Sequence, residues 1–261
     1  MAPILEIKGL CKQFGGLRAV SDFDMELQEG DLAGLIGPNG AGKTTVFNLI
    51  TGVYPVSSGE IRFQGASVCG RQPYQINQSG VARTFQNIRL FPALSVLDNV
   101  RVACHAHGSY STAEGIFRLG RHKAREREIT ERAREMLSVF NLLDRQDELA
   151  RNLPYGAQRR VEIARALAAK PRLLLLDEPA AGMNPSEVGS LMDMIRFIRE
   201  RFRLTILLIE HQMRVVMGIC EHITVMDFGQ VIARGRPQEI QNNPQVIEAY
   251  LGRGAAARTA P

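Results

Sequence analysis

The stretch that decides the fold of this chain is Gly37-Pro38-Asn39-Gly40-Ala41-Gly42-Lys43-Thr44, followed by Thr45. It fits the pattern G-x-x-x-x-G-K-[ST] of a phosphate-binding loop. The apolar run Leu32–Ile36 before it predicts a buried strand, and Lys43–Thr51 after it predicts a helix. A strand, a loop and a helix in this order are the context in which the pattern binds phosphate groups.

The chemistry of this loop follows from its glycines, its lysine and its threonine. Glycine lets the backbone turn tightly, so that successive N–H groups point at one place, where the helix N-terminus adds a partial positive charge. Lys43 would reach the β- and γ-phosphates of a nucleotide, and the Thr44 hydroxyl would bind Mg²⁺. The alternatives are an incidental glycine-rich turn and a dinucleotide site. The second is disfavoured because G-x-G-x-x-G does not occur in the right context.

The composition is typical of a soluble globular protein. Of the 261 residues, 45% are hydrophobic and 23% are charged, which allows a substantial core and one or two domains. A net charge of +5 and a pI near 9.2 suit an anionic partner such as a nucleic acid, a membrane surface or nucleotide phosphates, and equally suit simple solubility. Because no apolar run approaches 18 residues, no membrane span is expected, and the N-terminus shows no secretory signal.

The four cysteines lie far apart, at Cys11, Cys69, Cys104 and Cys220. They form no C-x-x-C pair and no zinc pattern with the five histidines. We therefore expect reduced, mostly buried thiols in a cytosolic protein.

Three short runs, Ile4–Lys8, Phe23–Gln28 and Glu60–Gln64, are separated by glycine-bearing turns and predict strands. Apolar and polar residues alternate in Phe23–Gln28, which is typical of a half-exposed antiparallel strand. An antiparallel β layer is therefore expected first, with the phosphate loop after it. Phe14 falls in a turn of this layer, where it could be a core aromatic or could stack on a purine base.

The pattern turns helical between about residues 87 and 158. Ser95 is a candidate N-cap for a helix through Cys104, and Gly108–Gly120 is typical of a loop. Arg121–Phe140 predicts a helix in which Arg and Glu side chains are interleaved. Such mixed charges favour a solvated face over a nucleic-acid surface.

Two polar sites flank this helical region. Gln86 follows a short strand-like alternation, and its amide oxygen is a candidate ligand of Mg²⁺ or water, although a lone glutamine is more often a surface group. Leu153–Gln158 opens a helix predicted over 161–169. Exposed polar groups at a helix N-terminus suit an anion.

A buried parallel strand, Leu173–Leu176, ends in Asp177 and Glu178. Ligands of open α/β sheets bind at the carboxyl ends of the strands. Asp177 would hold Mg²⁺ through its water shell, and Glu178 would polarise an attacking water. A second buried strand, Leu204–Ile209, leads to His211, which could hydrogen-bond a γ-phosphate or a water, or could be structural.

The last third of the chain completes the predicted α/β unit. A helix is expected from Pro185 to about Arg201. A β-hairpin formed by His222–Asp227 and Gln230–Arg234 comes next, and then a helix over Pro237–Leu251. Gly252–Pro261 is small and polar, and is expected to be disordered.

In this order the phosphate loop, Gln86, Leu153–Gln158, Leu173–Glu178 and His211 resemble the ATP-binding subunit of ABC transporters, over nearly the whole chain. The resemblance implies an α/β fold: a P-loop NTPase (RecA-like) core with an antiparallel β layer and an inserted α-helical subdomain. The core would comprise residues 1–86 and 159–251, the helical signature subdomain 87–158, and the tail 252–261. The implied activity is ATP hydrolysis coupled to transmembrane transport, with Mg²⁺ as cofactor.

Longer stretches are similar to one group in this family, the larger of the two ATP-binding subunits of branched-chain amino acid importers. They are Arg83–Phe91, Tyr155–Arg165, Ala180–Pro185 and Asn243–Gly252. This resemblance implies a peripheral subunit on the cytoplasmic face of the inner membrane. Its partners would be two transmembrane permeases, a paralogous second ATPase subunit or a second copy of itself and, indirectly, an external substrate-binding protein, but no nucleic acid.

The resemblance also assigns roles to individual residues. Phe14 would stack on adenine, Gly37 to Thr45 would bind ATP, and Thr44, Gln86 and Asp177 would serve Mg²⁺. Glu178 would be the general base, and His211 the switch histidine. The signature that closes over ATP on the partner ATPase would be Leu153, Pro154, Tyr155, Gly156, Ala157 and Gln158.

This signature departs from the family pattern Leu-Ser-Gly-Gly-Gln. Pro154 replaces the serine, Tyr155 the first glycine and Ala157 the glutamine. A hydroxyl contact to the γ-phosphate is therefore not expected, whereas the Gly156 N–H and the helix dipole remain. Asn184 stands where the family usually has an aspartate at the dimer seam, which removes a charge there.

Two other functions fit part of these patterns. The ATPase of another transporter, for urea, other amino acids or lipopolysaccharide, would carry the same motifs, because the cargo is bound by other chains. A non-transport ABC ATPase acting on DNA or ribosomes would usually have two cassettes or long coiled coils, whereas this chain has one cassette and no sustained heptads. A GTPase is disfavoured because N-K-x-D is absent from the sequence.

Overall fold

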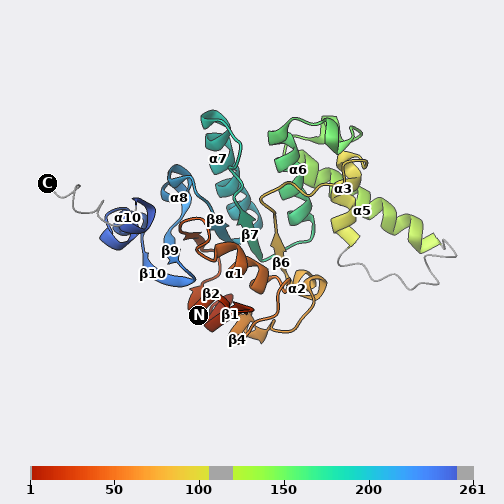
Figure 1. Cartoon of the computed structure of the whole chain (residues 1–261). Coiled ribbons are helices and arrows are strands. Elements are labelled where there is room, and N and C mark those ends of the chain that lie inside the picture. The colour runs from red at the N-terminus through yellow and green to blue at the C-terminus, as the bar shows by residue number, and fades with distance from the viewer. Residues whose placement is uncertain (1, 106–119, 252–261) are drawn as a thin grey trace. The chain divides into compact units, whose positions relative to one another are not determined.

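The computed structural model describes residues 2–105 and 120–251, which form two compact units (Figure 1). The first unit, the core unit, joins the chain up to Ile76 to the chain from Arg172 onward, and the second, the helical unit, comprises Asn77–Pro171. The predicted loop Gly108–Gly120 lies outside the described residues except for Gly120, and the predicted tail Gly252–Pro261 lies wholly outside them.

The core unit contains an antiparallel sheet of order β2-β1-β4-β5, which confirms the predicted β layer. Its strands are β1 (Leu5–Phe14), β2 (Leu17–Leu27), β4 (Ser58–Phe63) and β5 (Ala66–Ser67). Strands β1 and β2 form a long hairpin that pairs Leu5 with Leu27 and Phe14 with Leu17. Both strands are longer than the apolar runs that predicted them, because cross-strand pairing continues beyond the buried residues up to the turn at Gly15-Gly16.

A mostly parallel sheet supplies the other layer of the core unit, with the order β10-β9-β3-β8-β7. The strands are β3 (Leu32–Ile36), β7 (Leu173–Asp177), β8 (Thr205–Ile209), β9 (His222–Asp227) and β10 (Gln230–Gly235). Strand β3 pairs in parallel with both β8 and β9, and only β10 runs antiparallel to its neighbour β9 among these pairs. Every residue of β3, β7 and β8 is buried, which explains their nearly continuous apolar sequences.

Helices of the core unit follow the strands. They are α1 (Lys43–Ile50), α7 (Pro185–Phe202), α8 (Met213–Ile219), α9 (Pro237–Gln241) and α10 (Pro244–Leu251), and α2 (Pro73–Ser79) spans the boundary at Ile76. The single helix predicted over Pro237–Leu251 is thus two helices. The chain turns at Asn242 and restarts at Pro244, because proline is favoured in a first helical turn and cannot continue a helix.

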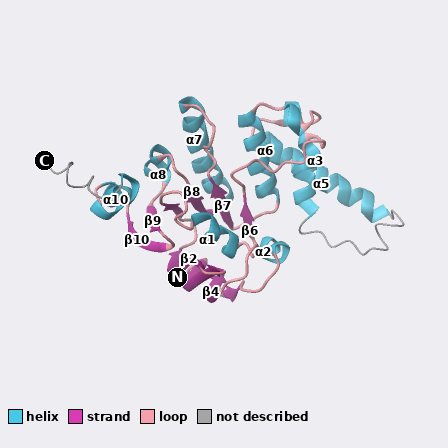
Figure 2. Cartoon of the chain, in the orientation of Figure 1, coloured by secondary structure: helices cyan, strands magenta, loops and turns pink. Residues whose placement is uncertain are grey.

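Among its described residues, 77–105 and 120–171, the helical unit contains three longer helices and a few short regular elements (Figure 2). These are α3 (Val96–Cys104), α5 (Gly120–Val139) and α6 (Tyr155–Ala168), joined by the short 3-10 helices η2 (Leu143–Arg145) and η3 (Ala150–Asn152) and preceded by strand β6 (Val81–Arg83). All three helices contact one another. The buried side chains between them include Val96, Val100, Ile129, Ala133, Leu137, Val161, Ala164 and Leu167.

This packing explains why the unit extends beyond the predicted bounds of 87–158. Helix α6 begins at Tyr155 rather than at residue 161, and its apolar stripe packs on α3 and α5, so the helix belongs to the helical unit as a whole. The boundaries observed in the structure therefore fall at Ile76/Asn77 and Pro171/Arg172.

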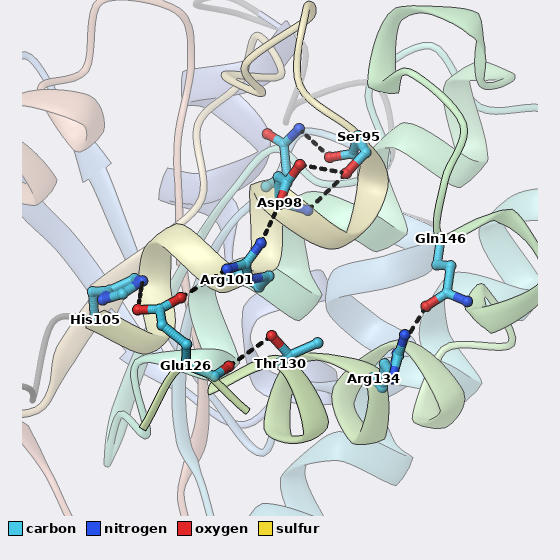
Figure 3. A network of polar contacts seen from close by, with 9 residues as sticks. Ser95, Asp98, Arg101, His105, Glu126, Thr130, Arg134 and Gln146 are labelled. Atoms are coloured by element: carbon cyan, nitrogen blue, oxygen red, sulfur yellow. Dashed lines mark hydrogen bonds and ion pairs between the residues drawn. The ribbon is translucent and has the colours of Figure 1, made fainter. Parts of the chain in front are cut away.

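Polar contacts join α3 to α5, and join α5 to the segment that follows α5 (Figure 3). Ser95 is the N-cap of α3, as predicted, and its hydroxyl accepts a hydrogen bond from the Asp98 amide at 3.0 Å. Arg101 donates to Asp98 at 2.7 Å and to Glu126 of α5 at 2.8 Å. Arg134 of α5 donates to Gln146 at 3.1 Å, so ionic and amide contacts tie together segments that are distant in sequence.

Candidate nucleotide site

The phosphate loop runs from the end of β3 to the start of α1, in the strand–loop–helix context that the sequence predicts. Gly37, Gly40 and Gly42 have φ angles of 149°, 81° and 102°, which side-chain-bearing residues rarely adopt. A Cβ atom at Gly37 would overlap the carbonyl oxygen of Met226 in β9, and one at Gly42 would lie 2.5 Å from that of Ala19 in β2. The glycines therefore permit both the turn itself and its close packing.

Lys43 is buried at the centre of this loop and is only 5% exposed. Its ammonium group donates to the carbonyl oxygens of Gly37 at 2.7 Å and Pro38 at 2.8 Å. Burial lowers the pKa of Lys43, and the charges of Glu178 and Asp177 oppose that shift. The lysine thus feels the charges of the carboxylates at the end of β7, those of Asp177 and of Glu178, which follows it.

The carboxyl ends of β7 and β8 bring Glu178 and His211 together. Glu178 follows β7 with a left-handed φ of 46°, and its amide donates to the carbonyl of Ile209 at 2.8 Å. This turn aims the carboxylate at His211, whose Nε2 lies 2.5 Å from Glu178 Oε1. Sequence patterns placed each residue at a strand end but did not predict their direct contact, which gives a candidate general base a fixed orientation.

Glu210 holds the backbone around this pair. It is 2% exposed, and its carboxylate accepts hydrogen bonds from the amides of Ala180 at 2.7 Å, His211 at 3.0 Å and Gln212 at 3.2 Å. Burial raises the pKa of Glu210, and the three amides oppose the rise. One buried carboxylate thus ties the loop after β7 to the loop after β8.

Phe14 lies at the end of β1, with 40% of its surface exposed. Its ring meets the ring of Tyr54 edge to face, with centroids 5.1 Å apart, and the Lys12 ammonium sits 4.8 Å from its centroid. An exposed aromatic beside a cation is compatible with stacking on a purine base. The stacking role of Phe14 stays a prediction, and Tyr54 is a neighbour that the sequence did not reveal.

The signature stretch opens α6 in the helical unit. Pro154 is the N-cap, and Tyr155 to Gln158 form the first helical turn, with Gln158 Nε2 donating to the carbonyl of Leu153 at 2.8 Å. Amide groups of a first helical turn suit an anion, and a contact between the Gly156 amide and a phosphate stays a prediction.

A buried ion pair one turn further along α6 holds the backbone of the Gln86 loop. Arg159 and Glu162 are 0% and 1% exposed and lie 2.7 Å apart. Arg159 also donates to the carbonyls of Phe85 at 2.7 Å and Gln86 at 2.8 Å, and to the Tyr155 hydroxyl at 3.0 Å. Through Arg159, hydrogen bonds therefore link Tyr155 of the signature to the backbone at Gln86 within the helical unit.

Neither Arg159 nor Glu162 was singled out from sequence. The available signal was their i,i+3 spacing on a helix, but the same spacing marks exposed pairs such as Arg134 with Glu131. Asn184 has a local role that the sequence alone did not reveal either. Its side chain accepts from the amides of Ser186 and Glu187 at 3.0 Å each and so caps α7.

The donors proposed for Mg²⁺ are oxygen atoms of the kind this ion prefers. In the core unit, Thr44 offers an exposed hydroxyl beside Lys43, and Asp177 a carboxylate at the end of β7. Gln86 belongs to the helical unit. Within residues 2–105 and 120–251, no three His, Cys, Asp or Glu side chains gather into a metal cluster. The oxygen donors of the core unit, Thr44 and Asp177, are thus of the kind that can hold an ion together with substrate phosphates, and their role stays a prediction.

Comparison with known proteins identifies the family. Residues 20–181, more than half of the chain, match the family model described as ABC transporter, and residues 230–256 match the one described as branched-chain amino acid ATP-binding cassette transporter. The chain is similar to the high-affinity branched-chain amino acid transport ATP-binding protein BraF of Pseudomonas aeruginosa, at 45% identity over 96% of this chain and 98% of that protein. LivG of Escherichia coli, with the same description, is 44% identical over the same shares of the two chains.

A solved structure supports the same family. The ADP conformation of MJ1267, an ATP-binding cassette of an ABC transporter, superposes with a TM-score of 0.83 at 29% identity, covering 97% of this chain and all of that one. This likeness confirms the predicted P-loop NTPase core with its β layer and helical insert. The chain therefore belongs to the ABC transporter family, as one of its ATP-binding, ATP-hydrolysing subunits.

Proposed function

We propose that this chain hydrolyses MgATP at the loop Gly37–Thr45 to drive import of branched-chain, or related hydrophobic, amino acids across the inner membrane. The observation that carries the proposal is the convergence of Lys43, Asp177 and the Glu178–His211 pair at the carboxyl edge of the parallel sheet. The match of residues 230–256 to a branched-chain amino acid model, and the names of the relatives, support the cargo over urea or lipopolysaccharide.

The residues of this edge and of the segments named above have distinct parts in the proposed reaction. Loop amides and Lys43 bind the phosphates, and Phe14 stacks on the base. Thr44, Asp177 and Gln86 would hold Mg²⁺, which would supply positive charge to offset the charge of the phosphates. Glu178 takes a proton from the attacking water, and the contact with His211 holds its carboxylate in one orientation. The signature Leu153–Gln158 of one subunit closes over ATP held by a second ATPase.

The first test changes the candidate base. Glu178→Gln preserves shape but removes proton acceptance, so MgATP binding should persist while turnover falls about 10²-fold or more. Glu200→Gln, on the exposed surface of α7, is the matched control and should hydrolyse ATP normally. Wild-type turnover in Glu178→Gln would refute the assignment of the base.

The partner surface we propose for the permeases is a groove of about 630 Å³ in the helical unit. Arginine guanidinium groups lie over its aromatic rings, with Arg83 and Arg89 at 5.1 and 4.3 Å from Phe85, and Arg165 at 5.7 Å from Phe91. Such a lining fits an amphipathic helix with a carboxylate, which a cytoplasmic permease loop could supply. Among residues 2–105 and 120–251, no helix has the length and apolar character to cross a membrane.

The second test uses charge reversal in this groove. Arg89 is exposed, so Arg89→Glu should leave MgATP binding intact and abolish co-purification of co-expressed permeases in detergent. Arg127→Glu, on the exposed face of α5, should retain the permeases. Equal recovery with both variants would reject this docking surface. Uptake of labelled leucine, but not urea, by vesicles carrying the assembled complex would decide the cargo.

A further inference from the structure

Lys12, Phe14 and Tyr54 form a cluster at the end of β1. The rings of Phe14 and Tyr54 meet at 80°, with their centroids 5.1 Å apart. The Lys12 ammonium lies 4.8 Å from the centroid of the Phe14 ring and 5.9 Å from that of the Tyr54 ring, within the range of cation–π contacts. Lys12 is only 8% exposed, whereas the two rings keep 40% and 37% of their surface open. A buried cation therefore lies beside two aromatic rings that each remain partly accessible.

The segment that carries Tyr54 is held from both sides. It follows α1, and the Tyr54 amide donates to the carbonyl of Asn48 in that helix at 3.3 Å. From the side of β1, the Lys12 ammonium donates to the Pro55 carbonyl at 2.7 Å. The Ser57 amide donates to a carbonyl of β1 at 3.0 Å. This segment therefore connects the helix that begins at the phosphate loop to the strand that ends in the exposed aromatic.

The two ends of a nucleotide would be bound by these two elements. Its phosphates would lie on the loop that leads into α1, and its base on Phe14 at the end of β1. A ring that is free to change rotamer loses entropy when a base stacks on it, whereas a ring already held by its neighbours loses less. An edge-to-face partner and a nearby cation each favour particular orientations of a ring. The cluster thus restricts Phe14 before any ligand arrives.

We propose that Tyr54 is a positioning residue for the nucleotide base, because it holds the Phe14 ring in the orientation on which the base stacks. This role depends on the proposed stacking of the base on Phe14. The chemical step is assigned to Glu178, at the carboxyl edge of the parallel sheet. Loss of the Tyr54 ring should therefore weaken binding of the base and change kcat little.

The test separates the base from the phosphates. Tyr54→Leu removes the ring but keeps an apolar side chain, so MgATP affinity in isothermal titration should fall about two- to tenfold, and the KM for ATP should rise similarly. Affinity for magnesium tripolyphosphate, which has no base, should stay at the wild-type value. Tyr54→Phe restores a ring and should recover most of the MgATP affinity. Tyr74→Leu, the same substitution at an exposed tyrosine of α2, is the control and should match the wild type.

A loss in Tyr54→Leu that is confined to MgATP supports the proposal. Unchanged MgATP affinity overturns it. An equal loss for magnesium tripolyphosphate also overturns it, because Tyr54 would then act through the phosphate loop or through the stability of the core unit. Phe14→Leu checks the assignment on which the role depends, and wild-type MgATP affinity in that variant would overturn the inference while phosphate binding stands. Failure of the wild-type protein to bind MgATP would instead overturn the proposed function.

Discussion

Removing the charge of Glu162 is the sharpest test of what holds the helical unit together. The Glu162 carboxylate faces Arg159 at 2.7 Å with both side chains almost completely buried, and it also accepts from the Arg89 amide at 3.2 Å. Glu162→Gln keeps the volume but leaves the guanidinium without its counter-charge. Breaking a buried pair in this way costs about 3–5 kcal/mol.

The expected effect is large enough to measure directly. Because a glutamine oxygen can still accept one hydrogen bond, we take the lower figure of about 3 kcal/mol, which corresponds to a fall in Tm of roughly 6–12 °C for a protein of this size. The control is Glu131→Gln in the same unit, since Glu131 pairs with Arg134 at the same i,i+3 spacing but is 66% exposed. An exposed pair contributes about 0–1 kcal/mol, so its Tm should move little.

Differential scanning calorimetry of the three proteins decides the question. A Tm for Glu162→Gln within 1 °C of that of Glu131→Gln would show that the buried pair does not stabilise the unit, and the reasoning would fail. ATP turnover in Glu162→Gln should fall as well, because Arg159 anchors the carbonyl of Gln86 at 2.8 Å. Turnover is measured well below the transition temperature, so that a loss reports the displaced Gln86 loop and not unfolding.

Three further predictions concern single residues. Asn184→Ala should lower the free energy of unfolding by about 1 kcal/mol, since the side chain caps α7, whereas Asn184→Asp should retain the cap, as urea denaturation would show. Burial raises the pKa of Cys220 to about 12 from 9.0. The contribution of this thiol to the free energy of unfolding is therefore complete below pH 9. It is lost as the pH rises towards 12, because the thiol ionises more readily in the unfolded chain. Cys220→Ala should therefore flatten that part of the plot of urea midpoint against pH. Gly42→Ala should reduce MgATP affinity at least tenfold, because its Cβ would meet a carbonyl of β2 at 2.5 Å. A Cβ at Gly40 would have nothing within 4 Å, so Gly40→Ala should lower only the free energy of unfolding, by the roughly 1–2 kcal/mol of a left-handed alanine. Equal MgATP affinities of the two variants in isothermal titration would contradict the role of packing at Gly42.

The sequence predicted the sheet strands and the phosphate loop because their signals are local. A buried strand such as Leu32–Ile36 needs an apolar run, and its predicted and observed bounds agree. The loop needs glycines at fixed offsets, and three of them take positive φ angles. Helix α3 was predicted in the same way from Ser95, whose capping bond lies within four residues.

Contacts between distant segments could not be read in this way. Nothing in the order of residues says that Arg159 binds the carbonyl of Gln86, or that Glu210 accepts a hydrogen bond from the amide of Ala180. The sequence predicts the start of α6 at Val161, after the opening stretch Leu153–Arg160, whereas the helix begins six residues earlier, at Tyr155. Proline is in fact favoured beside a helix N-terminus, and the buried residues later in α6 stabilise the turn that contains the glycine.

Glu210 is next to His211 in sequence and has a structural role that affects the proposed reaction. A glutamate at the end of an apolar strand suggests a solvent-exposed carboxylate, yet this one is 2% exposed and accepts three backbone hydrogen bonds. Two of the donors are the amides of His211 and Gln212, in the loop after β8, and the third, the amide of Ala180, lies two residues after Glu178. Since the distance between Glu178 and His211 depends on both loops, the carboxylate that joins them sets the alignment of the pair, and a change at Glu210 should impair hydrolysis more than MgATP binding.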